Sequence, residues 1–129
     1  MAKKIVVIED SDFVQRTFLT VLTAGGFQVT VGKDGSEGLS LVAREKPDLI
    51  LLDLMMPVLD GFKVLNFLKN DPKTSEIPVI VLSAKGNSDE IQRAISMGAR
   101  DFLIKSTTPP KKVLEKVKEI LGTNTGGTK

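Results

Sequence analysis

Four short apolar segments of this chain each end in residues whose side chains can take part in polar chemistry. These residues are three carboxylates, one hydroxyl and one ammonium: Glu9, Asp10, Asp53, Ser83 and Lys105. If the four segments are parallel strands of one sheet, their carboxyl ends lie side by side and the five groups share one crevice. Such a set of groups suits the phosphorylation of an aspartate with help from a divalent metal.

The three carboxylates predict a magnesium site. Two carboxylates about 4 Å apart repel each other by roughly 4 kcal/mol at an effective dielectric constant near 20, and a divalent cation removes this cost. Mg²⁺ prefers oxygen ligands and keeps several of its water molecules, which a few carboxylates and a backbone carbonyl would allow.

The composition narrows the possible chemistry. The chain of 129 residues contains neither cysteine nor histidine. Disulfides, thiolate nucleophiles, imidazole bases and phosphohistidine are therefore excluded within it, so carboxylates, lysines and hydroxyls must carry any chemistry.

Length and charge predict one ordinary globular domain. With 41% apolar residues, 26% charged residues and a net charge of +2, the chain resembles a soluble protein with one core. We expect the domain to span residues 1–121 and the Gly- and Thr-rich residues 122–129 to form a flexible tail. The scattered lysines argue against direct nucleic-acid binding, and the lack of a long apolar run argues against membrane insertion, so we expect a cytoplasmic protein.

Strand and helix patterns alternate along the chain. Short apolar or β-branched runs predict strands at residues 4–8, 28–31, 48–52, 79–82 and 102–104. Amphipathic patterns predict helices at residues 12–24, 36–45 and 61–70, a helix capped by Ser88 that stops at Gly98, and a helix at 111–121 opened by Pro110. Strands separated by single helices imply parallel pairing with right-handed crossovers, and hence an α/β fold built as a three-layer α/β/α sandwich.

The strand-end residues carry a resemblance to a known family. Glu9-Asp10, Asp53 within the segment Leu-Leu-Asp-Leu-Met-Met-Pro-Val-Leu-Asp-Gly, Ser83-Ala84 and Lys105 together resemble the receiver domain of two-component response regulators. The resemblance runs from about Lys4 to Leu121 and is closest to the chemotaxis-regulator type. It implies a flavodoxin-like, five-stranded parallel sheet in the order 2-1-3-4-5.

The resemblance also implies a role for each site residue. Asp53 would be the phosphoacceptor, with Mg²⁺ held by Asp10, Asp53 and the backbone carbonyl of Met55, and by Glu9 partly through water. Lys105 would neutralise charge on the phosphoryl group. Ser83 and Phe102 would be the switch residues, the hydroxyl moving toward the phosphoryl group and the aromatic ring turning inward behind it.

The sequence departs from the family pattern at several positions. Ser106 follows Lys105, where the family has proline after a cis bond, and we expect a trans bond here because cis bonds to other residues cost about 2.5 to 4 kcal/mol. Phe102 replaces a tyrosine and Ser83 a threonine. Met55 and Lys85 occupy the positions that tune phospho-form lifetime, and neither can orient a water molecule as an acid or amide would, so we expect slow self-dephosphorylation.

The function implied is that of a signalling switch in a phosphorelay, with no chemistry beyond its own phosphorylation and dephosphorylation. Its partners would be a sensor histidine kinase or a histidine phosphotransfer protein, and a downstream protein that reads the surface around the last strand and the last two helices. The chain would be a monomer or a phosphorylation-dependent dimer. The alternatives are a phosphatase with an aspartate nucleophile, a pseudo-receiver binding module, and a flavin or nucleotide binder.

Overall fold

The structure is a computed structural model that describes residues 2–56, 60–84 and 86–122. Strands and helices alternate in the order β1 (Lys4–Ile8), α1 (Asp12–Ala24), β2 (Gln28–Gly32), α2 (Gly35–Glu45), β3 (Leu49–Asp53), α3 (Gly61–Asn70), β4 (Val79–Ser83), α4 (Ser88–Ser96), β5 (Asp101–Ile104) and α5 (Pro110–Leu121). Lys85 and most of the predicted tail, residues 123–129, lie outside the described residues.

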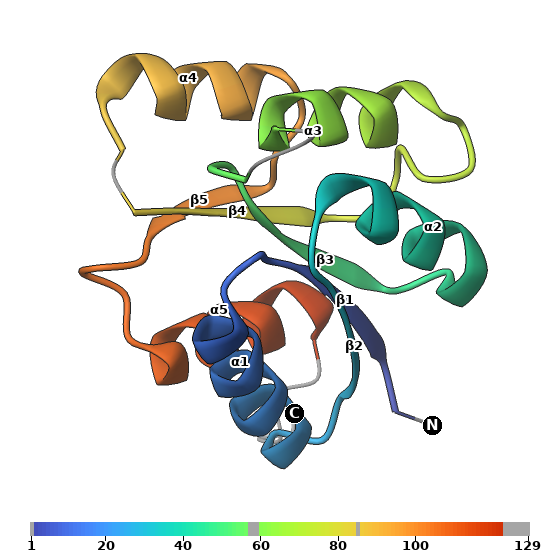
Figure 1. Cartoon of the computed structure of the whole chain (residues 1–129), viewed down its shortest axis with the longest axis vertical. Coiled ribbons are helices and arrows are strands. Elements are labelled where there is room, and N and C mark those ends of the chain that lie inside the picture. Colours follow the sequence, from blue (N-terminus) through green and yellow to red (C-terminus); the bar gives the residue numbers. More distant parts are fainter. Residues whose placement is uncertain (1, 57–59, 85, 123–129) are drawn as a thin grey trace.

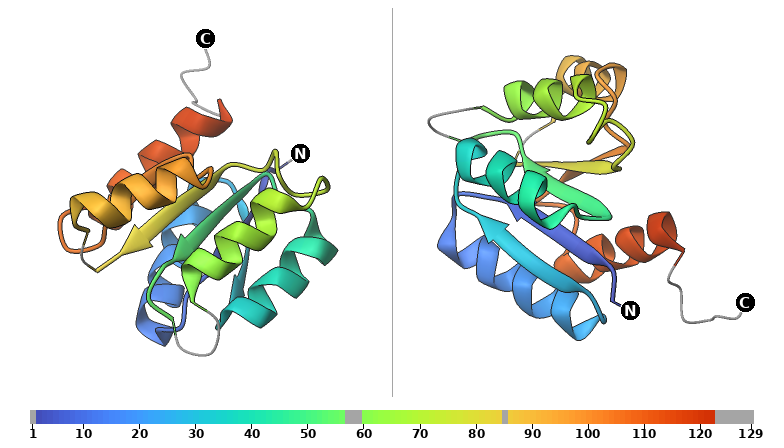
Figure 2. Two further views of the ribbon diagram at one scale, coloured as in Figure 1. Left: turned by 90° about the horizontal axis from the view of Figure 1, so that it is seen from above. Right: turned by 90° about the vertical axis from the view of Figure 1, so that its right-hand side faces the viewer.

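The five strands form one parallel sheet in the order β2-β1-β3-β4-β5. Helices α1 and α5 cover one face of this sheet, and α2, α3 and α4 cover the other (Figures 1 and 2). The predicted three-layer sandwich and its strand order are therefore confirmed.

Two hydrophobic clusters hold the layers together, because successive residues of a strand point to opposite faces. In β1, Val6 packs beneath α2, α3 and α4, whereas Val7 packs beneath α1 and α5. Every residue of β3 and β4 is buried. This explains the continuous apolar runs in the sequence, since a parallel strand covered on both faces has no solvent side.

Several elements differ from their predicted limits by one residue. Pairing in the sheet continues to Gly32, Asp53 and Ser83, so these residues belong to strands. β3 begins at Leu49 and not at residue 48, although Asp48 is bound to Lys4 twice: its backbone N–H donates to the Lys4 carbonyl and its side chain accepts the Lys4 N–H, both at 2.8 Å. The prediction that Ser88 caps α4 was wrong. Asn87 is the cap, and its side-chain oxygen accepts the Glu90 N–H at 2.9 Å.

The start of α3 packs directly on the end of β3. The Gly61 N–H donates to the Leu54 carbonyl at 3.0 Å. A β-carbon at Gly61 would lie 2.5 Å from the Leu54 Cα and 2.7 Å from the Asp53 carbonyl oxygen, distances that no real side chain tolerates. Glycine is therefore required where α3 begins, and the position of α3 is tied to the backbone of Asp53.

No helix in the described part of the chain is both long and apolar enough to cross a membrane.

Candidate functional site

Three carboxylates meet at the carboxyl edge of the sheet. Glu9 and Asp10 follow β1, and Asp53 ends β3, the strand that pairs with β1. One carboxylate oxygen from each of the three lies within 4.8 Å of the others. Glu9 is 1% exposed and Asp53 is 3% exposed, whereas Asp10 faces solvent. The structure thus brings together the acids that the sequence placed at two separate strand ends.

Lys105 connects the two buried acids of this cluster. Its Nζ lies 2.7 Å from Glu9 Oε1 and 3.3 Å from Asp53 Oδ2, and its side chain is 24% exposed. Its backbone N–H donates to the Ser83 carbonyl at 2.8 Å, which fixes the chain where it leaves β5. The bond between Lys105 and Ser106 is trans, as expected without a proline at residue 106.

Burial and neighbouring charge set the protonation of the site. Burial, followed by the negative charge of Glu9, raises the pKa of Asp53 to about 6, although Lys105 and the Met55 N–H act in the opposite direction. Burial alone would lower the pKa of Lys105, but its hydrogen bond to Glu9 and the charge of Asp53 more than offset this, and the pKa is raised. At neutral pH, Asp53 is therefore mostly ionised and Lys105 is charged.

Backbone and side-chain hydrogen bonds hold the acids in place. The Ser11 N–H donates to Glu9 Oε2 at 3.0 Å, and the Met55 N–H donates to Asp53 Oδ1 at 3.1 Å. The Gln15 side chain donates to the Glu9 carbonyl at 2.5 Å. Neither Ser11 nor Gln15 was predicted as a site residue. The sequence signal for them was weak: Ser11 immediately precedes the helix that follows the acid pair, and Gln15 lies near the start of that helix.

Ser83 and Phe102 lie on neighbouring strands beside the acids. Ser83 ends β4, which pairs with β3, and it is 1% exposed. Phe102 is partly buried on β5, opposite Val81. A β-carbon at Gly86 would lie 2.8 Å from Phe102 Cε1, so the ring packs closely against the loop between β4 and α4.

Met55 lies two residues beyond Asp53, where its side chain is 65% exposed. The Met55 backbone N–H donates to the Asp53 carboxylate, whereas the Met55 side chain faces solvent. Lys85, the other position singled out for lifetime, lies outside the described residues.

The donor set fits a hard divalent cation. Within the described residues, Lys105 pairs with Glu9 and Asp53 but not with Asp10, so the three clustered carboxylates carry more negative charge than this ammonium offsets, and two of them are almost entirely buried. Mg²⁺ binds carboxylate oxygens and keeps several of its water molecules. The cluster offers carboxylate oxygens, and the exposed Asp10 leaves one side of it open to water.

Comparison with known proteins agrees with this geometry. The family model described as "Response regulator receiver domain" matches residues 5–118. The chain is 43% identical to the response regulator PleD of Caulobacter vibrioides (strain NA1000 / CB15N) over 106 residues, which are 81% of this chain and 23% of PleD. It is 32% identical to the phosphate regulon transcriptional regulatory protein PhoB of Escherichia coli (strain K12) over 121 residues, which are 94% of this chain and 52% of PhoB.

Solved structures show the same fold. The receiver domain of the Francisella response regulator 1452 is 30% identical, with a TM-score of 0.84 over 95% of this chain and 98% of that one. A CheY-like receiver domain protein from Methanospirillum hungatei JF-1 has a TM-score of 0.88 at 22% identity, covering 95% of this chain and 96% of that one. The chain spans about a quarter of the length of PleD and about half of that of PhoB.

Proposed function

Because this chain belongs to the response regulator receiver domain family, we propose that it accepts a phosphoryl group on Asp53 in a magnesium-dependent reaction and thereby changes the surface that its partners bind. Receiver domains are switch domains of two-component signalling. The proposed domain spans residues 1–121, and its proposed compartment is the cytoplasm.

The observation that carries this proposal is the environment of Asp53. Its carboxylate is buried at a strand end, lies within 4.8 Å of two further acids and pairs with Lys105 at 3.3 Å. With a pKa near 6, it is mostly ionised at neutral pH and can act as a nucleophile. One carboxylate oxygen would bond to phosphorus while the bond from phosphorus to the donor breaks, and the electron pair of that bond leaves with the donor.

The neighbouring residues suit the charge that this transfer creates. Asp10, Asp53 and the backbone carbonyl of Met55 would hold Mg²⁺, with Glu9 acting partly through water. The bound ion would supply charge neutralisation on the phosphoryl oxygens. Lys105 would provide a second positive charge, exchanging part of its contact with Glu9 and Asp53 for a contact with the phosphoryl group.

Ser83 and Phe102 would convert the chemical change into a structural one. The Ser83 hydroxyl would donate to a phosphoryl oxygen, a bond that can exist only in the phosphorylated state. Phe102 would then turn inward on the neighbouring strand. Because the Phe102 ring touches the loop at Gly86, this movement would reach α4, which follows that loop.

Receiver domains interact with histidine kinases and with downstream effectors. For this chain, we propose a sensor histidine kinase or a histidine phosphotransfer protein as the donor, and a protein as the downstream target.

The proposal is tested by incubating the protein with acetyl phosphate and Mg²⁺ and measuring its intact mass. We expect a gain of one phosphoryl group that requires Mg²⁺ and is absent in Asp53→Asn. Asp89→Asn, which removes a solvent-facing acid from α4, is the matched control and should be phosphorylated like the unchanged protein. A failure to gain mass, or a gain that persists in Asp53→Asn, would overturn the proposal.

A further inference from the structure

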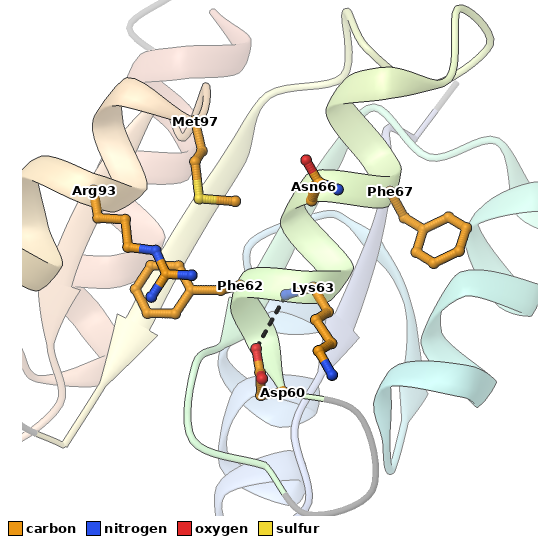
Figure 3. A pocket seen from close by; sticks show the side chains of 7 residues that line it. All are labelled: Asp60, Phe62, Lys63, Asn66, Phe67, Arg93 and Met97. Carbon is orange, nitrogen blue, oxygen red and sulfur yellow. Dashed lines mark hydrogen bonds between the residues drawn. The ribbon is translucent and has the colours of Figure 1, made fainter.

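A hollow of about 480 Å³ lies beside α3 and α4, and none of the three clustered carboxylates lines it (Figure 3). Phe62 of α3 and Met97, which follows α4, line the space between the two helices. Phe67 projects from the other flank of α3 and is 61% exposed. Aromatic residues, methionine and arginine are enriched at protein interfaces, so this composition is typical of a surface that binds another protein.

The Arg93 side chain of α4 closes one side of this hollow. Its guanidinium carbon lies 3.9 Å from the centroid of the Phe62 ring, a cation–π contact that orders a long side chain. Such stacking holds the guanidinium in place without neutralising its charge. Arg93 is therefore preorganised to meet an anionic group of a ligand.

Two cations, Arg93 and Lys63, and one acid, Asp60, line the hollow. Within the described part of the chain, neither Arg93 nor Lys63 forms an ion pair. The acid that lines the hollow, Asp60, caps α3 and accepts the Lys63 N–H at 3.1 Å. The hollow thus combines apolar side chains with two cations that form no ion pair among the residues that the structure describes.

We propose that this hollow docks an acidic amphipathic helix of a partner protein. An apolar side chain of that helix would rest on Phe62 and Met97, and its carboxylates would meet Arg93 and Lys63, which is the helix-in-groove mode of recognition. A second copy of this chain fits less well, because its net charge is +2 and it would bring further cations to a cationic surface. Docking here goes beyond the proposed phosphorylation, because the residues that line the hollow include neither the clustered acids nor Lys105.

The probe is a synthetic, fluorescein-labelled amphipathic peptide with leucines on one helical face and glutamates on the other. Fluorescence anisotropy with the whole chain should show saturable binding, and nuclear magnetic resonance shifts should map to Phe62, Arg93 and Met97. Arg93→Glu and Lys63→Glu should each weaken binding about tenfold or more, as expected for residues at the centre of an interface. Circular dichroism confirms that each variant is folded.

Arg16→Glu on α1 is the matched charge reversal, since Arg16 is exposed and forms no ion pair within the described residues. It should leave binding within about twofold of the unchanged protein. Equal weakening by Arg16→Glu and Arg93→Glu, shifts on another face, self-association through α3 and α4 in sedimentation, or no saturable binding would each overturn the proposal. Asp53→Asn should bind the peptide normally, which separates this test from that of phosphorylation.

Discussion

Asp53 is held in a charged form that its burial disfavours. Because its pKa is raised from 3.8 to about 6, the folded state holds a proton between these two pH values that the unfolded state has released. Stability should therefore fall as pH rises through this window and stay lowered above it. A pKa of about 6 still leaves the Asp53 carboxylate mostly ionised, and therefore available as a nucleophile, at neutral pH.

This environment predicts the effect of removing the Asp53 charge. In the presence of EDTA, Asp53→Asn should raise the free energy of unfolding at pH 7.5 by about 1 to 3 kcal/mol, and by much less at pH 4. Urea denaturation at the two pH values measures this difference. Asp89→Asn should show no such pH dependence, and an equal gain for Asp53→Asn at both pH values would contradict the prediction.

Lys105 is shared by two acids, so its removal should affect both. Lys105→Gln leaves Glu9 and Asp53 without their ammonium, and we expect a loss of about 1 to 3 kcal/mol of stability at pH 8. The loss should shrink at pH 5, where Asp53 takes up a proton. Denaturation curves measure this loss, and the control is Lys116→Gln, which breaks ion pairs with Asp101 of β5 and Glu119 of α5 away from the carboxylate cluster. A loss that is the same at both pH values would argue against the shared pairing.

Met55 offers a test of the lifetime of the phosphorylated form. Its side chain is exposed beside Asp53 and cannot orient a water molecule, so phosphate loss should be slow. Met55→Asn should lose phosphate several-fold faster, and Met55→Leu should remain slow. Intact mass followed over time measures both rates, and equal or slower loss from Met55→Asn would count against this role.

Residue types indicated which strand-end side chains would gather, but they did not predict the contacts among them. The acids, Ser83 and Lys105 were identified because each follows an apolar strand. The preference of Lys105 for Glu9 at 2.7 Å over Asp53 at 3.3 Å was not predictable, because it depends on side-chain conformations across 96 residues of sequence. Gln15 was missed for a different reason, because its partner is a backbone carbonyl and not a chemically distinctive side chain.

At the scale of elements, the contact between α3 and β3 couples the site to a helix. Gly61→Ala would force a methyl group against the backbone of Leu54 and Asp53, so either α3 or Asp53 must shift. We expect a loss of about 1 to 3 kcal/mol of stability and slower phosphorylation by acetyl phosphate.

Gly25→Ala is the matched control for this helix contact. A methyl group there would meet the end of the Leu114 side chain, which can rotate away, and the Gly25 φ of −79° is open to any residue. Denaturation and phosphorylation rates of the two variants should therefore differ, with Gly25→Ala the milder. Similar effects from both would show that α3 is not specially coupled to Asp53.

Hydrophobic periodicity was enough to predict which segments are helices and which are strands. The exact ends of the strands could not be predicted in this way, because they depend on pairing with neighbouring strands. Apolar runs and amphipathic stripes predicted all the strands and helices that the structure describes. The strands extend to Gly32, Asp53 and Ser83 because each has a paired neighbour, and pairing is a property of the sheet. Asn87 rather than Ser88 caps α4, because adjacent residues with similar capping ability are distinguished only by backbone geometry.

For the whole molecule, the acidic cluster predicts that Mg²⁺ stabilises the fold. Binding only to the folded cluster adds about 1.4 kcal/mol to the free energy of unfolding once free Mg²⁺ is tenfold above its dissociation constant. Thermal denaturation with increasing MgCl₂ measures this gain, with KCl at equal ionic strength as the reference. Asp10→Asn should reduce the gain and Asp12→Asn should preserve it. A gain that KCl reproduces would contradict a specific site.

The strand order was not predictable from hydrophobic periodicity, which cannot say which strands are neighbours. It was implied by the family resemblance and is confirmed by the sheet. The hollow between α3 and α4 had no sequence signal, because it depends on how two helices separated by a strand lie beside each other.

The strand order also determines when a growing chain acquires its reactivity. Strands β1, β2 and β3 pair among themselves within the first 53 residues, so this half of the sheet can begin to assemble while the rest is still being synthesised. Asp53 is then present, but its ammonium partner arrives only after β5, the last strand. A partly made chain therefore carries Asp53 without Lys105, and the proposed phosphoryl transfer would draw on both residues only once β5 is in place.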